Sequence, residues 1–158
     1  SGLSAAAFAF GQCFEVAEVG HLRYLQKIFR HLRLASVSSL PLFLPREIVS
    51  MLRTYARWQI SFECSHLRKV ADRMIATRSQ FDIENSVAGL HALATLMQRN
   101  AVRSVSSDAT AATWEAVSDA GRSLLAPVWP AARSNEVDMQ TLLRALESAV
   151  VLQVHDPE

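Results

Sequence analysis

The chain has 158 residues, half of them hydrophobic, with only five glycines and five prolines. These values fit one ordered domain and exclude a disordered polar tail, and the abundance of alanine and leucine favours helix. The net charge of +1 hides an asymmetry, because residues 19–80 hold eleven Arg or Lys against three Asp or Glu, whereas residues 104–158 hold three against eight. A basic half of this kind indicates either a polyanionic partner or the acidic face of another protein.

Several classes of protein are not supported by the sequence. No apolar stretch approaches the roughly 18 residues that a membrane span needs, so none is predicted. Cys13 and Cys64 lie far apart and are predicted to be small buried hydrophobic residues. The histidines show no metal-ligand spacing, so no metal or cofactor is predicted. The chain starts at Ser1 rather than at Met, which suggests a processed or excised fragment.

Four segments carry apolar residues at i, i+4, i+7 and i+10, which is the pattern of an amphipathic helix. They are residues 3–17, 45–60, 82–99 and 138–153. Offsets of 80, 38 and 56 superpose the other segments on residues 82–99, for example Val49 on Val87 and Leu146 on Leu90. The segments are therefore interpreted as copies of one repeated helix.

A further helix is predicted before each copy except the first, at residues 21–34, 65–77 and 112–126. The predicted connections are rich in Ser, Pro and Gly and include 36–45, 104–110 and 127–135. The result is a single domain over 1–158 with a lone helix at 3–17 and helix pairs at 21–60, 65–99 and 112–153.

Stacked helix pairs predict an all-α fold, a right-handed α-solenoid of antiparallel helix pairs with about seven helices. A start halfway through a pair suggests a fragment of a longer solenoid. A compact seven-helix bundle is the alternative.

The helix starts support the alignment. Asp82 and Asp138 stand where an N-cap carboxylate accepts the first free backbone N–H groups, and Pro45 stands at a first helical position. Ala9, Gly89 and Ala145 share one column of the alignment, with Met51 as the exception, and a small residue there is expected to let a neighbouring helix approach closely.

The segment FDIENSVAGLHALATL at residues 81–96 resembles the heptatricopeptide and octotricopeptide repeats. It is also similar to the repeats of the Fas-activated serine/threonine kinase family and its relatives with a RAP domain. The resemblance implies RNA binding in mitochondria or plastids, in transcript maturation, stabilisation, editing or ribosome assembly. It is the source of the expected mitochondrial localisation.

The helix at 45–60 offers a candidate RNA-binding face. Arg46, Arg53 and Arg57 are seven and four residues apart, so they share one side of the helix and can hold successive phosphates. The equivalent positions Arg53, His91 and Glu147 are where one base per repeat would be recognised. The other basic candidates lie on the preceding helices and are Arg23, Lys27, Arg30, Arg33, Arg68, Lys69 and Arg73.

Aromatic residues near these arginines offer stacking surfaces for bases. Tyr24, Tyr55 and Trp58 are the candidates. Tyr55 falls in the apolar stripe and is therefore expected in the core.

The main alternative is a protein scaffold of the HEAT type, a subunit of a large assembly that makes no direct contact with RNA. The apolar stretch SLPLFLP at 39–45 and the pair Val128 and Trp129 are candidate docking segments.

The sequence holds no P-loop and no GxSxG motif. Glu63, His66 and Asp72 are the residues from which a catalytic site could be assembled, but charges on a helix surface explain them more simply. The chain is therefore predicted to be a non-catalytic module with no small-molecule substrate, whose partners are RNA and other protein subunits.

Overall fold

The computed structural model describes residues 2, 5, 6, 9, 19–60, 62–103 and 108–154. Within these residues the chain is all-α and contains no strand, which confirms the all-α part of the predicted fold. The helices are α2 (Val19–Ser38), η1 (Leu40–Leu42), α3 (Pro45–Arg57), α4 (Cys64–Ala76), η2 (Arg78–Gln80), α5 (Ile83–Arg103), α6 (Asp108–Leu125), α7 (Val128–Arg133) and α8 (Met139–Leu152), of which η1 and η2 are 3-10 helices. The lone helix expected at 3–17 lies almost wholly outside the described residues.

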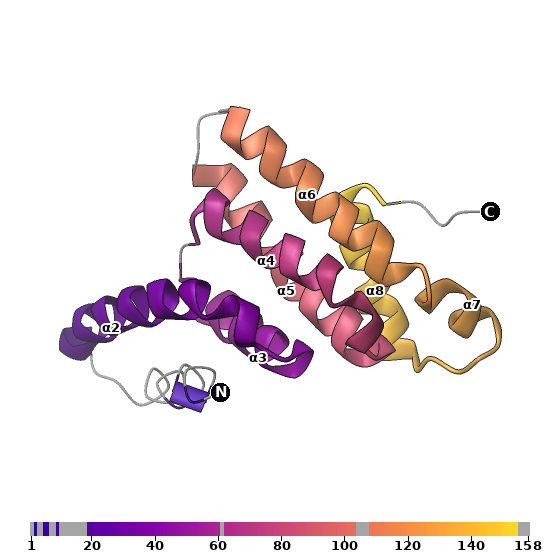
Figure 1. The fold of residues 1–158 in the computed structure, drawn as a ribbon, viewed down its shortest axis with the longest axis horizontal. Helices are drawn as coiled ribbons and strands as arrows, with labels where there is room; N and C mark the ends of the chain where they lie inside the picture. Colours follow the sequence, from indigo (N-terminus) through magenta and orange to yellow (C-terminus); the bar gives the residue numbers. More distant parts are fainter. Residues whose placement is uncertain are drawn as a thin grey trace.

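Helices that hold the same position in the predicted repeat pack side by side. The most extensive contacts join α3 with α5, α5 with α8, and α4 with α6. Figure 1 shows the succession along the molecule, from α2 and α3 at one end, through α4 and α5, to α6, α7 and α8 at the other. The second helices of the three expected pairs, α3, α5 and α8, therefore form one row.

The predicted helix starts are confirmed. The Asp82 carboxylate accepts a hydrogen bond from the Asn85 backbone N–H at 2.7 Å, and Asp138 accepts from the backbone N–H groups of Gln140 and Thr141. A hydrogen bond with the Thr141 side chain, together with these backbone hydrogen bonds to the charged form, lowers the pKa of the Asp138 carboxyl. Pro45 is the first residue of α3. The free N–H groups at the helix start are thus bound by a carboxylate in α5 and in α8, whereas in α3 the first residue is a proline, which has no N–H group.

The end of α3 differs from the prediction. The helix ends at Arg57 rather than at residue 60, because Gln59 adopts a left-handed backbone with φ of 55°. The Ile60 N–H then donates to the Tyr55 carbonyl at 3.1 Å, which closes the last turn. Asn135 and Gln153 also have positive φ and end α7 and α8 in the same way.

Two expected connections are partly helical. The helix predicted at 21–34 continues through Ser38, since Val37 is buried and the Ser38 hydroxyl donates to the Leu34 carbonyl. The stretch 127–135, expected to be irregular, contains α7. Val128 and Trp129 are buried there, and Pro127 and Pro130 stand at the N-cap and in the first turn of α7, where the missing N–H of proline is tolerated.

Close approach of helices at Gly89 is confirmed. A Cβ at Gly89 would lie 2.9 Å from Met74 Cε and 3.2 Å from Val49 Cγ2, so these side chains of α4 and α3 pack directly on the α5 backbone and would have to shift to admit a side chain. Ala145, in the same column of the repeat, is fully buried on α8. The glycine therefore lets neighbouring helices come close at this point, whereas the α3 member of the column is the buried Met51.

The predicted apolar stripe of α8 is wrong in part. The repeat places Leu143 and Leu146 in core columns, yet both are exposed, together with Met139 and Val150. The buried side of α8 is formed by Thr141, Ala145, Ser148, Ala149 and Leu152. The reason is position: α5 lies between α3 and α8, whereas α8 packs on α5 and α6 and has no such neighbour on its other side among the described helices.

Candidate nucleic-acid interface

The arginine face of α3 forms as the sequence predicts. Arg46, Arg53 and Arg57 are exposed, whereas Val49, Leu52 and Ala56, on the other side of the same helix, are buried. The packing of the apolar side against α5 fixes the rotation of α3 and points the three guanidinium groups away from the core. The three cations are therefore held by a rigid element rather than by a loop.

A cavity of about 500 Å³ lies beside these arginines. It opens between α3 and α5, and Arg144 reaches it from α8. The lining contains the three arginines of α3 and His91, which are four of the predicted site residues. The polar lining residues are Arg46, Ser50, Arg53, Thr54, Arg57, Asn85, His91, Thr95 and Arg144.

The charge in this cavity, which we call the arginine groove, is not neutralised by carboxylates of its own lining. Neither Arg46, Arg53 nor Arg144 forms an ion pair with any residue of the described ranges. Arg57 lies over the Trp58 ring, with its Cζ 5.2 Å from the ring centroid. The groove therefore presents four guanidinium groups, which suit an anionic ligand.

The predicted base-recognising column is brought together in part. Arg53 and His91 line the same groove, and His91 Nδ1 lies 3.6 Å from Glu147 Oε2 on the next helix of the row. His91 and Glu147 are both partly exposed. The repeat thus places an arginine, a histidine and a carboxylate on successive helices, with different hydrogen-bonding capacities at equivalent positions.

The groove is braced from α5. The Arg99 guanidinium donates to the Ala56 carbonyl in the last turn of α3, where a cation satisfies an orphan acceptor. Thr95, which lines the groove, donates its hydroxyl hydrogen bond to the His91 carbonyl at 2.8 Å. Hydrogen bonds therefore join α5 to the last turn of α3 and fix the Thr95 side chain on its own helix.

Sequence reasoning missed Arg144. The signal was present, because the offset of 56 places Arg144 in the column of Ala88, and the offset of 38 places Ser50 there too. All three residues line the groove. The column next to the arginine face contributes to the same wall, and only its α8 member carries a charge.

The other basic candidates with described side chains do not line the groove. Lys27 and Arg30 are exposed on α2, and Arg68 and Lys69 line a separate cavity of about 400 Å³ with Asp72. Arg73 is half-buried and donates to the Phe43 carbonyl at 3.2 Å. The Arg23 side chain lies outside the described part of the molecule. The structure therefore separates the basic half into one groove and several other positions.

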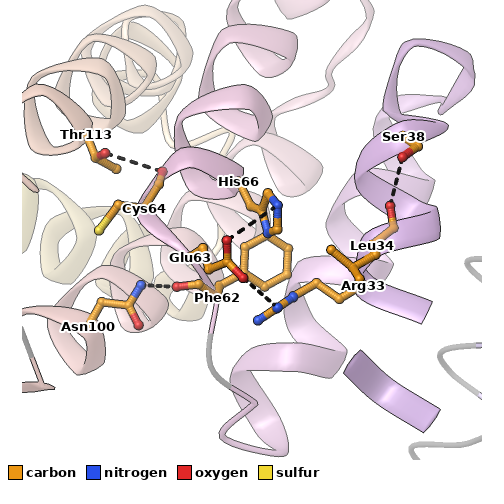
Figure 2. Close-up of polar contacts among 9 residues, drawn as sticks. All are labelled: Arg33, Leu34, Ser38, Phe62, Glu63, Cys64, His66, Asn100 and Thr113. Atoms are coloured by element: carbon orange, nitrogen blue, oxygen red, sulfur yellow. Dashed lines mark hydrogen bonds and ion pairs between the residues drawn. The ribbon is translucent and has the colours of Figure 1, made fainter. Parts of the chain in front are cut away.

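Arg33 is buried in a polar cluster that joins α2 to the start of α4. Its Nη2 donates to Glu63 Oε1 at 2.9 Å, and His66 Nε2 lies 3.9 Å from Glu63 Oε2 (Figure 2). Burial lowers the pKa of His66, while Glu63 raises it and Arg33 lowers it. Asn100 donates to the Phe62 carbonyl beside this cluster. The cluster therefore holds α2 against the start of α4. Asp72 lies at an exposed position of α4 and is not part of the cluster.

The aromatic candidates take three different positions. Tyr55 is fully buried, as expected for a core residue, with its ring edge-on to Phe29 and Phe62. Burial raises the pKa of Tyr55 to about 12. Trp58 is half-buried on the groove wall and Tyr24 is exposed on α2. Only Trp58 offers a stacking surface at the arginines.

The predicted docking segments are mostly in the core. Leu40 and Phe43 are buried, and only Leu42 and Leu44 of the stretch 39–45 are exposed among its large apolar residues. Val128 and Trp129 are buried in α7. The expectation of a free docking segment is therefore wrong for Val128 and Trp129, and in the stretch 39–45 it holds only for Leu42 and Leu44, because the other apolar side chains fill the core.

Two further findings concern the described residues alone. No helix among them has the length and apolar character needed to cross a membrane. No three His, Cys, Asp or Glu side chains in the described ranges gather as a possible metal site.

A comparison of the chain with protein-family models, curated proteins and solved structures finds no match.

Proposed function

We propose that the chain is a non-catalytic helical-repeat module that binds single-stranded RNA in the arginine groove. The observation that carries this proposal is the convergence of Arg46, Arg53 and Arg57 with Arg144 on one cavity of about 500 Å³. Arginine forks onto phosphates and stacks on bases, and the groove combines both uses.

The geometry favours a strand over a small anion. Arg46 and Arg57 are eleven residues apart on α3, which corresponds to about 16 Å along a helix. A row of cations of that length suits several successive phosphates. Trp58 at one end of the row and His91 on the opposite wall supply a stacking surface and a hydrogen-bonding group for bases.

The repeat pattern extends the proposal to the architecture. We infer that the row α3, α5 and α8 is part of an α-solenoid whose second helices line the RNA-binding side. The resemblance of residues 81–96 to organellar helical repeats supports a mitochondrial location and a role in RNA processing, RNA editing or ribosome assembly.

A titration of fluorescent single-stranded RNA tests the proposal. The Arg46→Ala/Arg53→Ala variant removes two groove cations, and Arg78→Ala/Arg122→Ala removes two exposed arginines outside the groove, so the net charge changes equally. For single strands each phosphate contact contributes about 0.7 to the slope of log K against log salt. The groove variant is expected to reduce that slope by about 1.4 and the control to leave it nearly unchanged.

Equal losses in the two variants would show non-specific attraction to a basic surface and would refute the groove as the site. Absence of binding to the unaltered chain at low salt would refute RNA binding altogether.

A protein scaffold without RNA contact is the second candidate. One observation favours it: α8 exposes Met139, Leu143, Leu146 and Val150 along one side, and isolated soluble domains rarely expose contiguous apolar patches of this kind without a binding role. If RNA binding fails in the titration, this candidate accounts for the fold without using the groove.

A further inference from the structure

The α3 side and the α8 side of the arginine groove carry different charges. The lining from α3 contains three cations, Arg46, Arg53 and Arg57. On α8, Arg144 lines the groove, and the carboxylate Glu147 follows one turn later. Glu147 Oε2 lies 3.6 Å from Nδ1 of His91, which belongs to the groove lining on α5. The charged lining of α3 is therefore cationic, whereas α8 places a cation beside an anion.

Packing fixes which side of α8 meets the groove. The buried side of the helix packs on α5 and α6 and consists of Thr141, Ala145, Ser148, Ala149 and Leu152. Arg144 and Glu147 are three residues apart, so they share one side of the helix. Arg144 is half-buried, and the Glu147 side chain is 52% exposed. Both side chains are therefore held at the edge of the groove by a helix whose rotation is fixed by its packing.

Arg144 and Glu147 do not neutralise each other. No ion pair joins these two described residues, although they are one turn apart on α8. On a regular helix their Cβ atoms are about 5–6 Å apart. A guanidinium group only donates hydrogen bonds, and an ionised carboxylate only accepts them. A ligand in the groove therefore meets donors and acceptors side by side on α8.

This combination suits a base better than it suits a phosphate. A phosphate would accept hydrogen bonds from Arg144 but would be repelled by the Glu147 carboxylate, whereas the three arginines of α3 only attract it. A base offers donors and acceptors together, and single-stranded RNA exposes the Watson–Crick and Hoogsteen edges of its bases. Phosphates on the α3 arginines would leave the bases to point across α5 towards α8.

Guanine is the base that matches both side chains. Its O6 and N7 are adjacent acceptors, which suit the fork of an arginine. Its N1–H and N2–H groups are adjacent donors, which suit the two oxygens of a carboxylate. Adenine and cytosine have one amino group each, and uracil has one ring N–H, so none of these three bases has two adjacent donor groups on its Watson–Crick edge.

We propose that Arg144 and Glu147 select guanine in the bound RNA strand. Glu147 accepts from N1–H and N2–H, and Arg144 donates to O6 and N7. The two edges adjoin each other on guanine as the two side chains adjoin each other on α8. This inference rests on the proposed binding of RNA in the groove, and it adds the base that the groove recognises.

Fluorescence anisotropy with short uridine strands that contain one variable nucleotide tests this selection on the unaltered chain. The strand with guanosine is expected to bind at least about fivefold more tightly than the strands with adenosine, cytidine or uridine. Inosine lacks the 2-amino group, and 7-deazaguanosine lacks the N7 acceptor. Each of these analogues is expected to weaken binding by about threefold or more relative to guanosine.

Two variants assign the two contacts. In Glu147→Gln the penalty for inosine is expected to disappear, and in Arg144→Met the penalty for 7-deazaguanosine is expected to disappear. Each penalty is a ratio measured within one variant, so the altered charge of the protein cancels. The controls Glu136→Gln and Arg78→Met change the same charges at exposed positions outside the groove lining, and both penalties are expected to persist in them.

The possible failures are distinguishable. Equal binding of all four strands by the unaltered chain would overturn guanine selection and leave RNA binding in the groove intact. A guanosine preference whose analogue penalties persist in Glu147→Gln and Arg144→Met, with both variants folded by circular dichroism, would show that other residues read the base. Absence of binding to every strand at low salt would overturn the proposed function and this inference with it.

Discussion

Substitution of Gly89 tests the packing on which the row of helices depends. Alanine in place of glycine favours a helix interior by about 0.8–1 kcal/mol. Against this gain, the added Cβ would lie 2.9 Å from Met74 Cε and 3.2 Å from Val49 Cγ2. The Met74 methyl group is the end of a flexible side chain, and moving it off its preferred rotamer costs about 0.5–1.5 kcal/mol. Gly89→Ala is therefore expected to change the free energy of unfolding by less than about 1 kcal/mol.

A second substitution, at Met74, separates the effect of the steric clash from the effect of the helix preference. Met74 is fully buried, so Met74→Ala is expected to cost about 2–5 kcal/mol through lost burial and a cavity. In that background the Cβ introduced by Gly89→Ala no longer meets the Met74 methyl group and fills part of the cavity. The double variant is expected to be more stable than the sum of the single changes by about 1 kcal/mol.

Urea unfolding followed by circular dichroism at unchanged m-value measures these free energies. The control is Gly89→Ala combined with Leu124→Ala, another buried residue, on α6, for which the two effects are expected to add. A coupling with Met74 no larger than the coupling with Leu124 would refute the close contact of α4 with α5 at this point.

Three further predictions concern stability. Glu63→Gln removes the carboxylate that accepts from the buried Arg33 guanidinium, and because Glu63 itself is 59% exposed the loss is expected to be about 1–2 kcal/mol in urea unfolding; no change would show that this ion pair contributes nothing to stability. The lowered pKa of His66 means that the unfolded chain binds the proton more readily, so stability present above about pH 6.5 is expected to fall as the pH drops through the lowered folded-state pKa. His66→Phe should reduce that pH dependence, and an unchanged profile would contradict the assignment. Gln59→Gly relieves a left-handed backbone and is expected to raise the free energy of unfolding by about 1 kcal/mol in the same assay, whereas destabilisation would mean that the Gln59 side chain makes a contact that matters.

Much of the fold follows from local sequence signals. The periodicity of apolar residues predicted α3, α4, α5, α6 and α8, and the N-cap carboxylates located the starts of α5 and α8. Helix ends were harder, because α3, α7 and α8 end at residues with left-handed backbone that are Gln or Asn rather than Gly. Tertiary contacts hold these residues in a conformation that the sequence alone does not favour.

The groove was predictable where one helix carries it and not where several helices share it. Arg46, Arg53 and Arg57 follow from spacing on a single helix. Arg144 reaches the same cavity only because α8 packs on α5, and helix spacing contains no information on that contact. Burial of Val128 and Trp129 also depends on tertiary packing, which is why their segment was expected to be an open loop.

Photocrosslinking of RNA to the chain tests the central proposal most directly. A single-stranded RNA with a photoreactive base is bound to the unaltered chain, crosslinked, and mapped by mass spectrometry to individual residues. We expect crosslinks on the walls of the arginine groove, which are residues 46–57 of α3, the adjoining Trp58, and residues 85–95 of α5. Crosslinks confined to α6 and α7, or none at low salt, would contradict RNA binding in the groove.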